Sequence, residues 1–365
     1  MPWTMTQALL PERCPKTDCP SNRPAKSRAP ARIVRHSFLC TKTGQQRRYR
    51  CRNCNHTFTA RSGTVYHRLR SSPSRFDRVV QMSVEGSSKA ALARAERVAP
   101  STVTRWVERA GRASRRMFDT VARDLHAEEL QADELRGYVW DKERRAFVFA
   151  MIEVGSRFWL STEVGGRTRR NALLLARDSR DRCARGQGRI LIVTDPFQFY
   201  AWAFKRSWGP TCVHVEASKL IRRGRVIRVR NTLVHGTTWQ LEAARERCTV
   251  SRKINTAFIE RLNLLMRRSL PCLQRRTNNA AKTREKLREM LDLLRVYYDF
   301  VRPHMSLKYG GICRTPGEIA GLVTRRLSFR DIFMAFRPMA SVPWIKDQRV
   351  REKWREQWAC PGSNS

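Results

Sequence analysis

The sequence predicts an α/β protein in which a mixed five-stranded sheet with helices follows two smaller amino-terminal parts. Three observations support this fold class. Strand-like segments alternate with helical segments from about residue 128 onward, a three-helix pattern precedes them, and two close cysteine pairs come first. The 365 residues suffice for two or three modules. We therefore expect four parts: a cysteine-containing module (1–68), a helical region (73–115), the α/β domain (128–316) and a basic carboxyl-terminal tail of unknown role (317–365).

The charge of the chain points to a polyanionic partner. Lys and Arg number 73 against 32 Asp and Glu, which gives a net charge of +41 that is spread along the whole sequence. Nucleic acid is the usual partner of such a protein. The start of the chain has no signal-peptide pattern, and no apolar run approaches the length of a membrane span. With 11 cysteines and no secretion signal, we expect a cytoplasmic, nucleoid-associated protein in a reducing compartment, with no membrane partner.

The amino-terminal cysteines have the pairing of a structural zinc site. Cys14 and Cys19 form one pair, and Cys51 and Cys54 form the second. Zinc takes four soft ligands in a tetrahedron, and two short-spaced pairs on facing turns supply them, as in zinc ribbons. The segment between the pairs, "SNRPAKSRAPAR", is polar and loop-like. The alternatives are four free thiols, or a ligand set that includes one of the nearby side chains of His36, Cys40 or His56.

Basic residues interleave this cluster, so the predicted zinc module is expected to contact DNA. The residues that we expect to do so are Arg47, Arg48 and Arg50.

The region 73–112 has the pattern of a helix-turn-helix. Gly86 ends a first amphipathic segment, Ser88 is a candidate N-cap for the second, and Pro100 suits the first position of the third. Val103, Trp106 and Val107 can face a core in the third helix. The side chains left to meet bases or phosphates are Ser101, Thr102, Thr104 and Arg105. A plain helical bundle that links two domains is the alternative.

The α/β region presents two aspartates on predicted strands. The segment "LQADELRGYVW" carries Asp133 in an apolar setting, and "RAFVFAMIEV" and "RFWLSTEV" are typical of a hairpin. A helical segment at 167–184 follows, and then the apolar strand 190–194 ends at Asp195. A buried strand that delivers an Asp at its carboxyl end is a common way to present a ligand to a cleft. "CVHVE" supplies a fifth strand.

A late helix at 254–270 carries an isolated acid, Glu260. Its apolar residues share one face, and Glu260 lies with Asn263 and Arg267 on a neighbouring polar stripe. Three hairpin-connected strands, a helix, a strand ending in Asp and a late helix with Glu form an RNase H-like order. Asp133, Asp195 and Glu260 can together hold two Mg²⁺ ions, because Mg²⁺ prefers oxygen ligands.

Each of these acids also has a structural explanation. Asp133 can be a turn residue, Asp195 can be a helix N-cap, and Glu260 can pair with an arginine such as Arg261 or Arg267. Glu134 and Asp141 are neighbouring acids that spacing alone does not exclude.

On these residues the chain resembles the DDE transposases of bacterial insertion sequences, most closely the IS1-like family. The resemblance rests on "CRNCNHTF", "VAPSTVTRW", "TDPFQFYAWAF" and the block from "INTAFIERLN" to "YYDFVRPHMSL". It implies that the amino-terminal parts bind terminal inverted repeats. It also implies that an RNase H-like domain cuts DNA and joins the 3′-hydroxyl to target DNA. The catalytic acids of the family match Asp133, Asp195 and Glu260. One departure concerns the reading frame. The IS1 element is usually described as two overlapping reading frames joined by frameshifting, whereas here one continuous frame encodes both halves.

The segment 219–236, "KLIRRGRVIRVRNTLVHG", is unusually cationic, and we interpret it as a strand plus loop that contacts the DNA backbone. Arg302 and His304 of "VRPH" are further candidates for the DNA-facing side, although capping of a helix end explains them equally well.

The resulting hypothesis is a transposase that binds inverted-repeat and target DNA and uses two Mg²⁺ or Mn²⁺ ions, with a structural Zn²⁺ and a homodimer or larger synaptic assembly. An inactive or repurposed transposase that acts as a DNA-binding repressor is the alternative. An RNA-binding protein is favoured by the charge alone.

Overall fold

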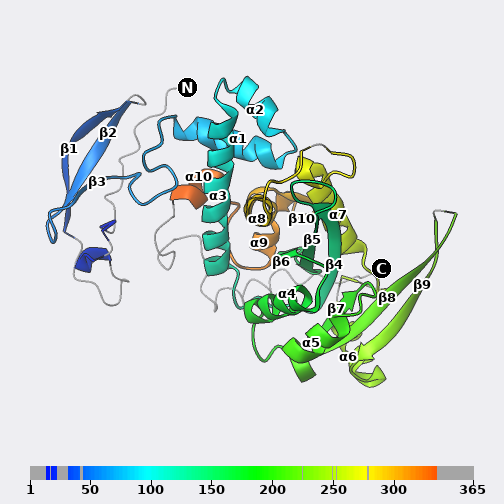
Figure 1. The fold of residues 1–365 in the computed structure, drawn as a ribbon. Coiled ribbons are helices and arrows are strands. Elements are labelled where there is room, and N and C mark those ends of the chain that lie inside the picture. The colour runs from blue at the N-terminus through cyan, green and yellow to red at the C-terminus, as the bar shows by residue number, and fades with distance from the viewer. Residues whose placement is uncertain are drawn as a thin grey trace. The chain divides into compact units, whose positions relative to one another are not determined.

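In the computed structural model the described residues form two compact units, 14–78 with 329–334 and 79–328 (Figure 1). The structure describes residues 14–16, 18–22, 32–41, 44–223, 225–248, 250–251, 253–277 and 279–334. Most of the predicted loop between the cysteine pairs (23–31) and of the predicted tail (335–365) lies outside the described residues. Among the described residues, no helix combines the length and hydrophobicity needed to cross a bilayer.

The first unit contains a small antiparallel sheet. Its strands are β1 (Ile33–Thr41), β2 (Gly44–Cys51) and β3 (Thr57–Thr59), in that order, and a 3₁₀ turn at Pro20–Asn22 precedes them. Ile33, Tyr49 and Phe58 form its core together with buried cysteines. Three large side chains are a small core, and modules of this size usually need a metal or disulfides to fold.

A second cluster of the first unit uses the carboxyl-terminal part of the described chain. The helix α10 (Phe329–Met334) places Phe333 against Tyr66 and Phe76, with ring centroids 6.2 and 5.8 Å apart. Asp77 joins this cluster by accepting hydrogen bonds from Tyr66 and Arg330. Residues 329–334, to which the sequence assigned no role, therefore complete the core of the first unit.

The helical region has the predicted three helices, α1 (Pro73–Val84), α2 (Lys89–Ala95) and α3 (Pro100–Val121). Ser88 Oγ accepts a hydrogen bond from the N–H of Ala91, and Pro100 occupies the first turn of α3, as the sequence predicts.

The third helix extends past residue 115 and packs along α8 (Arg284–Val296). Gly111 permits the close approach of these helices, because a Cβ there would lie 2.3 Å from the carbonyl oxygen of Glu289. The helix α3 therefore belongs to the core of the second unit. The predicted division of the chain into four parts stays a prediction.

The sheet of the second unit has six strands where the sequence predicted five. They are β4 (Glu129–Tyr138), β5 (Arg145–Glu153), β6 (Trp159–Gly165), β7 (Ile190–Thr194), β8 (Cys212–Arg222) and β9 (Arg225–His235). Their spatial order is β6-β5-β4-β7-β8-β9. β4, β7 and β8 are parallel, and the remaining pairs are antiparallel. The mixed α/β fold is thus confirmed, and its strand number is corrected.

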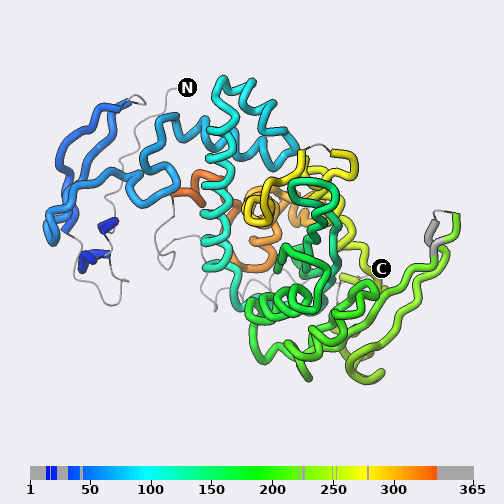
Figure 2. Tube along the Cα trace, viewed as in Figure 1, coloured from blue at the N-terminus to red at the C-terminus, as the bar shows by residue number. Residues whose placement is uncertain are grey.

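The additional strand comes from the cationic segment. Residues 225–235 pair with β8 over most of its length, so this segment is a hairpin rather than a strand plus loop (Figure 2). Apolar residues that alternate with the arginines, such as Val229, suit a strand in spite of the charge.

Helices cover both faces of the sheet. α4 (Arg169–Arg182) and α5 (Tyr200–Trp208) lie on one face, where Tyr200 contacts Phe149 and Phe204 contacts His214. α6 (Thr238–Arg247) and α7 (Ala257–Ser269) lie on the other face, where Ala244 packs with Val193 and Val215. This arrangement buries most of β4, β5 and β7 on both sides, while much of β9 is exposed.

The chain after α8 continues in a π-helical turn (Tyr297–Val301), a hairpin of β10 (His304–Tyr309) and β11 (Ile312–Arg314), and the short helix α9 (Pro316–Ile319). Phe300 of the π-helical turn packs with Phe118 of α3 and Phe158, so this segment belongs to the core of the second unit.

Candidate functional site

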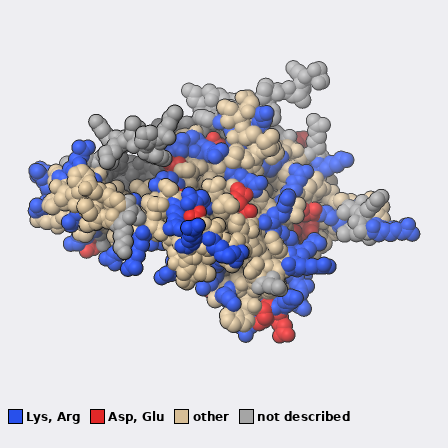
Figure 3. Space-filling model, turned by 90° about the horizontal axis from the view of Figure 1, so that it is seen from above, with Lys and Arg blue, Asp and Glu red and all other residues tan. Residues whose placement is uncertain are grey.

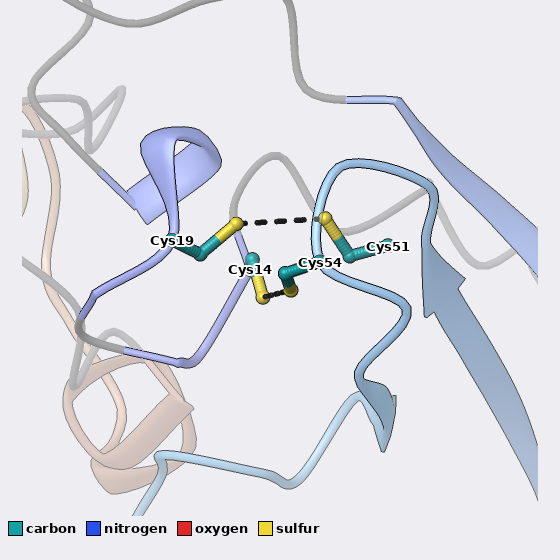
Figure 4. Close-up of side chains that lie close together, drawn as sticks. All are labelled: Cys14, Cys19, Cys51 and Cys54. Carbon is teal, nitrogen blue, oxygen red and sulfur yellow. Dashed lines mark hydrogen bonds between the residues drawn. The ribbon is translucent and has the colours of Figure 1, made fainter.

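The four predicted cysteines converge on one point in the first unit (Figure 4). The Sγ atoms of Cys14 and Cys54 lie 3.6 Å apart, and those of Cys19 and Cys51 lie 3.7 Å apart. A tetrahedral Zn²⁺ with Zn–S bonds of about 2.3 Å requires sulfurs roughly 3.8 Å from one another. The geometry therefore fits a structural zinc ion held by four thiolates, and it supports the predicted zinc-binding module.

The local turns explain this convergence. Cys19 lies just before the 3₁₀ turn, where the N–H of Asn22 donates to its carbonyl, and the N–H of Cys51 donates to His56 across the second turn. Burial raises the pKa of Cys14. Burial also acts to raise the pKa of Cys51, but hydrogen bonds with Ser21 and with backbone N–H groups outweigh it and lower the pKa to about 7. Cys51 therefore ionises more readily than a free cysteine, and the thiolate is the form that binds zinc.

The competing ligands lie elsewhere. Cys40 is an exposed residue of β1, His36 contacts Ser37, and His56 stacks on Phe58 with ring centroids 6.2 Å apart. Among the candidate ligands, the four whose sulfur atoms converge are therefore Cys14, Cys19, Cys51 and Cys54, which is consistent with a structural zinc site.

The predicted DNA-contacting arginines of this module are held on its small sheet. The guanidinium of Arg47 lies 3.7 Å from the ring centroid of Phe38, Arg48 donates to Thr57, and Arg50 donates to Asn55. Their contact with DNA stays a prediction.

The candidate recognition helix exposes part of the predicted set. Ser101 and Arg105 are exposed, and Thr102 and Thr104 are half-buried. Val103, Trp106 and Val107 are buried, as the helical spacing predicts. Thr104 lines a pocket of about 330 Å³ between α2, α3 and the segment after α7.

Asp133 and Asp195 lie side by side in the sheet of the second unit. β4 and β7 pair in parallel as far as Ala132 and Thr194, so the two aspartates are the next residues in register. Burial, and then the carboxylates of Asp195 and Glu134, raise the pKa of Asp133 to about 7, while Lys219 opposes this shift. One oxygen of Asp195, Oδ1, is buried and accepts no hydrogen bond from the described residues.

The helix α7 brings Glu260 to the same face of the sheet. Gln131, two residues before Asp133, accepts hydrogen bonds from the N–H groups of Phe258 and Ile259 and so fixes the start of α7 on β4. Asn263 Nδ2 donates to Asp133 Oδ2 over 2.7 Å. Since Glu260 lies one turn before Asn263, α7 carries it toward the two aspartates.

A lysine interacts with two of these acids. Lys219 of β8 forms an ion pair with Glu260 and donates to Thr256 Oγ1 over 2.9 Å. Its charge also acts on Asp133. The ion pair that the sequence allowed for Glu260 thus exists, but its partner is Lys219 rather than Arg261 or Arg267.

The carboxyl oxygens of Asp133, Asp195 and Glu260 do not all lie within 4.8 Å of one another. Within the described part of the chain, the cysteines form the one group of three or more His, Cys, Asp or Glu residues whose ligand atoms lie within 4.8 Å of one another. The magnesium site therefore stays a prediction.

The structure excludes the turn and N-cap explanations for the two aspartates, and it gives Glu134 and Asp141 other partners. Asp133 lies inside β4 rather than in a turn, and Asp195 is not an N-cap, because α5 begins after Phe199. Glu134 pairs with Arg167, and Asp141 accepts the N–H groups of the loop that follows it.

A group of cationic side chains includes Arg267, whose guanidinium is close enough to Asp133 to feel its charge. Arg267 donates to the carbonyl of Leu273 and lines a pocket of about 360 Å³. Arg136, Lys142 and Arg275 line the same pocket. Over the face seen in Figure 3, Lys and Arg are far more widespread than Asp and Glu. Such a surface favours a phosphate backbone.

No protein-family model matches the sequence, and no curated protein matches it significantly. The interpretation of the site therefore depends on its own geometry.

Sequence reasoning missed Gln131, Thr256 and Lys219 as neighbours of the acids. Gln131 carries a weak signal, since it is a polar residue two positions before Asp133 in a buried strand. Lys219 carries none, because it is one cation among many in its segment.

Proposed function

We propose that the protein is a DNA transposase that binds terminal inverted repeats and catalyses divalent-metal-dependent strand cleavage and strand transfer. One observation carries the proposal. Asp133 and Asp195 are adjacent on parallel strands, and α7, anchored by Gln131 and Asn263, brings Glu260 to the same face.

The sheet order adds support for an RNase H-like domain. Strands β6-β5-β4 form an antiparallel meander, and β7 and β8 follow in parallel on the other side of β4. In this order the first acid lies on the central strand and the second on its parallel neighbour. β9 and α6 are then an insertion before the helix that carries Glu260. The resemblance of "TDPFQFYAWAF" and "FIERLN" to the DDE transposases points to the same fold.

The donor chemistry of the three acids fits Mg²⁺ or Mn²⁺. Asp195 Oδ1 is a buried oxygen without a hydrogen-bond donor among the described residues, and Lys219 already brings a positive charge to Glu260. We assign Asp133, Asp195 and Glu260 as the residues that would hold two such ions. When bound, these ions supply activation of the attacking hydroxyl and stabilisation of the leaving oxygen.

The chain itself has four tasks in this reaction. Asn263 orients Asp133 through its amide, and Gln131 fixes the start of α7. Lys219 neutralises Glu260 until that carboxylate is needed as a ligand. Basic residues, Arg267 among them, hold the phosphate backbone near the acids.

The amino-terminal parts supply recognition in this proposal. The zinc-binding module offers Arg47, Arg48 and Arg50, and α3 offers Ser101 and Arg105 at its exposed start. We place the protein in the cytoplasm, on double-stranded DNA, as a homodimer or larger assembly, because transposition must hold two element ends together.

The test compares Asp195→Asn and Glu260→Gln with the wild-type chain on repeat-end DNA. Both variants should bind this DNA within about twofold of wild type. Both should lose Mg²⁺- or Mn²⁺-dependent cleavage by a factor on the order of 10³ or more, because each removes a carboxylate from the proposed metal site. Asp141→Asn is the matched control, since Asp141 accepts hydrogen bonds from the N–H groups of Glu143 and Arg144 in an exposed loop outside the proposed ligand set.

The alternative function, an inactive transposase-derived repressor, gives a different result. In that case the wild-type chain binds the repeat ends and shows no metal-dependent cleavage. Undiminished cleavage by either acid variant would contradict the assignment of the acids.

A further inference from the structure

A second cationic pocket lies on the opposite side of α7 from Glu260. It has a volume of about 360 Å³. Phe258, Leu262 and Leu265 of α7 line it, and by helical geometry they point away from Glu260. The segment 302–306, which includes the "VRPH" motif, and the turn between β5 and β6 complete it.

The β5–β6 turn delivers one arginine in an unusual conformation. The buried carboxylate of Glu153 accepts hydrogen bonds from the N–H groups of Gly155 and Ser156, which tightens the turn. Arg157 follows with φ 62°, in the left-handed region. This conformation is uncommon for a residue with a Cβ, and such strain tends to be kept where the side chain has a task.

Arg157 is one of three arginines that converge on the pocket. Its guanidinium lies 3.9 Å from the ring centroid of Phe258, and that of Arg261 lies 5.9 Å from the same ring. Burial and the charge of Arg261 lower the pKa of Arg157. Arg302 lines the pocket from the segment after the π-helical turn. Among the described residues, none of the three forms an ion pair with a carboxylate, and no Asp or Glu lines the pocket.

The inner walls are apolar and aromatic. Ile152, Leu262 and Tyr298 are buried at the pocket, and the rings of Tyr298 and His304 lie 4.4 Å apart at right angles. Burial, and the charges of Arg302 and Arg157, lower the pKa of His304 to about 4, so this wall is uncharged at neutral pH. The pocket therefore combines a cationic rim with a neutral aromatic interior.

We propose that this pocket binds one nucleotide unit, with the phosphate at Arg157, Arg261 and Arg302 and the base against the apolar wall. Three guanidiniums that form no ion pair among the described residues match a phosphate, which accepts bidentate hydrogen bonds from arginine. The charge of Glu153 acts on Arg157 from behind the turn. The flat base matches the aromatic interior. The nucleotide is either an unpaired unit of a DNA strand or a free nucleotide. Only the first source rests on the proposed function.

The experiment measures binding in EDTA, so that catalysis is not needed. One arm titrates the full chain into a thymidine oligonucleotide with a single 2-aminopurine near its end. The other arm titrates 2-aminopurine deoxyribonucleoside 5′-phosphate. The variants are Arg261→Gln and Arg302→Gln, which keep a polar side chain of similar length. Arg268→Gln is the matched control, because it removes the same charge from an exposed site of α7 that lies outside the pocket. Thermal melting of each variant checks that it is folded.

We expect each pocket variant to weaken binding about tenfold or more and to remove the change in 2-aminopurine fluorescence, while Arg268→Gln changes affinity less than threefold. Loss in the oligonucleotide arm identifies a DNA strand as the source, and loss in the mononucleotide arm identifies a free nucleotide. Pocket variants that behave like Arg268→Gln in both arms would overturn the proposal, and Arg157 would then serve only to cover Phe258. A chain that binds in EDTA but never cleaves DNA would refute the transposase and leave the pocket standing.

Discussion

Replacing Cys51 with Ser should abolish zinc binding and unfold the small sheet of the first unit. The core of this module consists of Ile33, Tyr49 and Phe58 beside the cysteines. Burial of three such side chains contributes roughly 4.5–9 kcal/mol at about 1.5–3 kcal/mol each. A four-ligand zinc site contributes about 10–16 kcal/mol in small zinc-binding modules. The metal is thus the larger contribution, and the sheet is not expected to persist without it.

The assay has two readouts, zinc content by atomic spectroscopy and protection of backbone amides in β1–β3 from hydrogen exchange. Wild-type chain should contain one zinc, and Cys51→Ser should contain none and lose protection in residues 33–59. Cys40→Ser is the matched control, since Cys40 is an exposed thiol outside the cluster. If Cys51→Ser kept a full equivalent of zinc, or kept its protection after the metal was lost, the reasoning would be refuted.

Three further predictions concern the second unit. Burial raises the pKa of Glu129 to about 7 from 4.5, so the folded state holds its proton to higher pH, and stability falls as pH rises from 4.5 to 7. Glu129→Gln should leave the free energy of unfolding unchanged at pH 4 and raise it by up to about 3 kcal/mol at pH 8, as measured by urea unfolding. An equal effect at both pH values would contradict the role of the raised pKa. Phe118→Ala should destabilise the unit by about 3–5 kcal/mol, because Phe118 is fully buried beside two aromatic rings. Leu264→Ala, at an exposed position, should change stability by less than about 0.5 kcal/mol. Similar urea-unfolding results for the two variants would show that the aromatic cluster is not tightly packed. Lys219→Met should strengthen Mn²⁺ binding about two- to fivefold, as measured by calorimetry. The reason is that a half-exposed ion pair, worth up to about 1 kcal/mol, no longer competes with the metal for Glu260. Weaker binding would mean that Lys219 helps to form the metal site.

The parts of the fold that the sequence predicted correctly have strong local signals. β7 occupies the predicted residues 190–194, because four consecutive apolar residues followed by Thr194, between Gly188 and Pro196, allow little else. The hairpin of β5 and β6 has a turn signal at Gly155–Ser156 between two apolar runs. The cysteine cluster was predictable for a similar reason, since each pair is local and zinc chemistry joins the pairs.

The parts that the sequence missed depend on contacts between distant residues. The sequence of β9 has the charge of a loop. It forms a strand because it pairs with β8, and not because it is buried. The length of α3 depends on Gly111, whose close contact is with Glu289, 178 positions along the chain. The role of α10 depends on Tyr66 and Phe76, which lie more than 250 residues before it. No local pattern encodes these partners.

Glu260 illustrates how local and distant information combine in the candidate site. The helical period of α7 places Glu260 on a polar stripe next to the apolar face. This position left two explanations open for Glu260, a metal ligand and an ion-pair partner. In the structure the ion pair forms with Lys219, whose charge also reaches Asp133. The two explanations are therefore compatible, since a carboxylate that is to bind a cation needs a compensating charge until that cation arrives. A double substitution separates these effects. If Lys219 and the metal compete for one carboxylate, Lys219→Met should no longer change Mn²⁺ affinity once Glu260→Gln has removed that carboxylate.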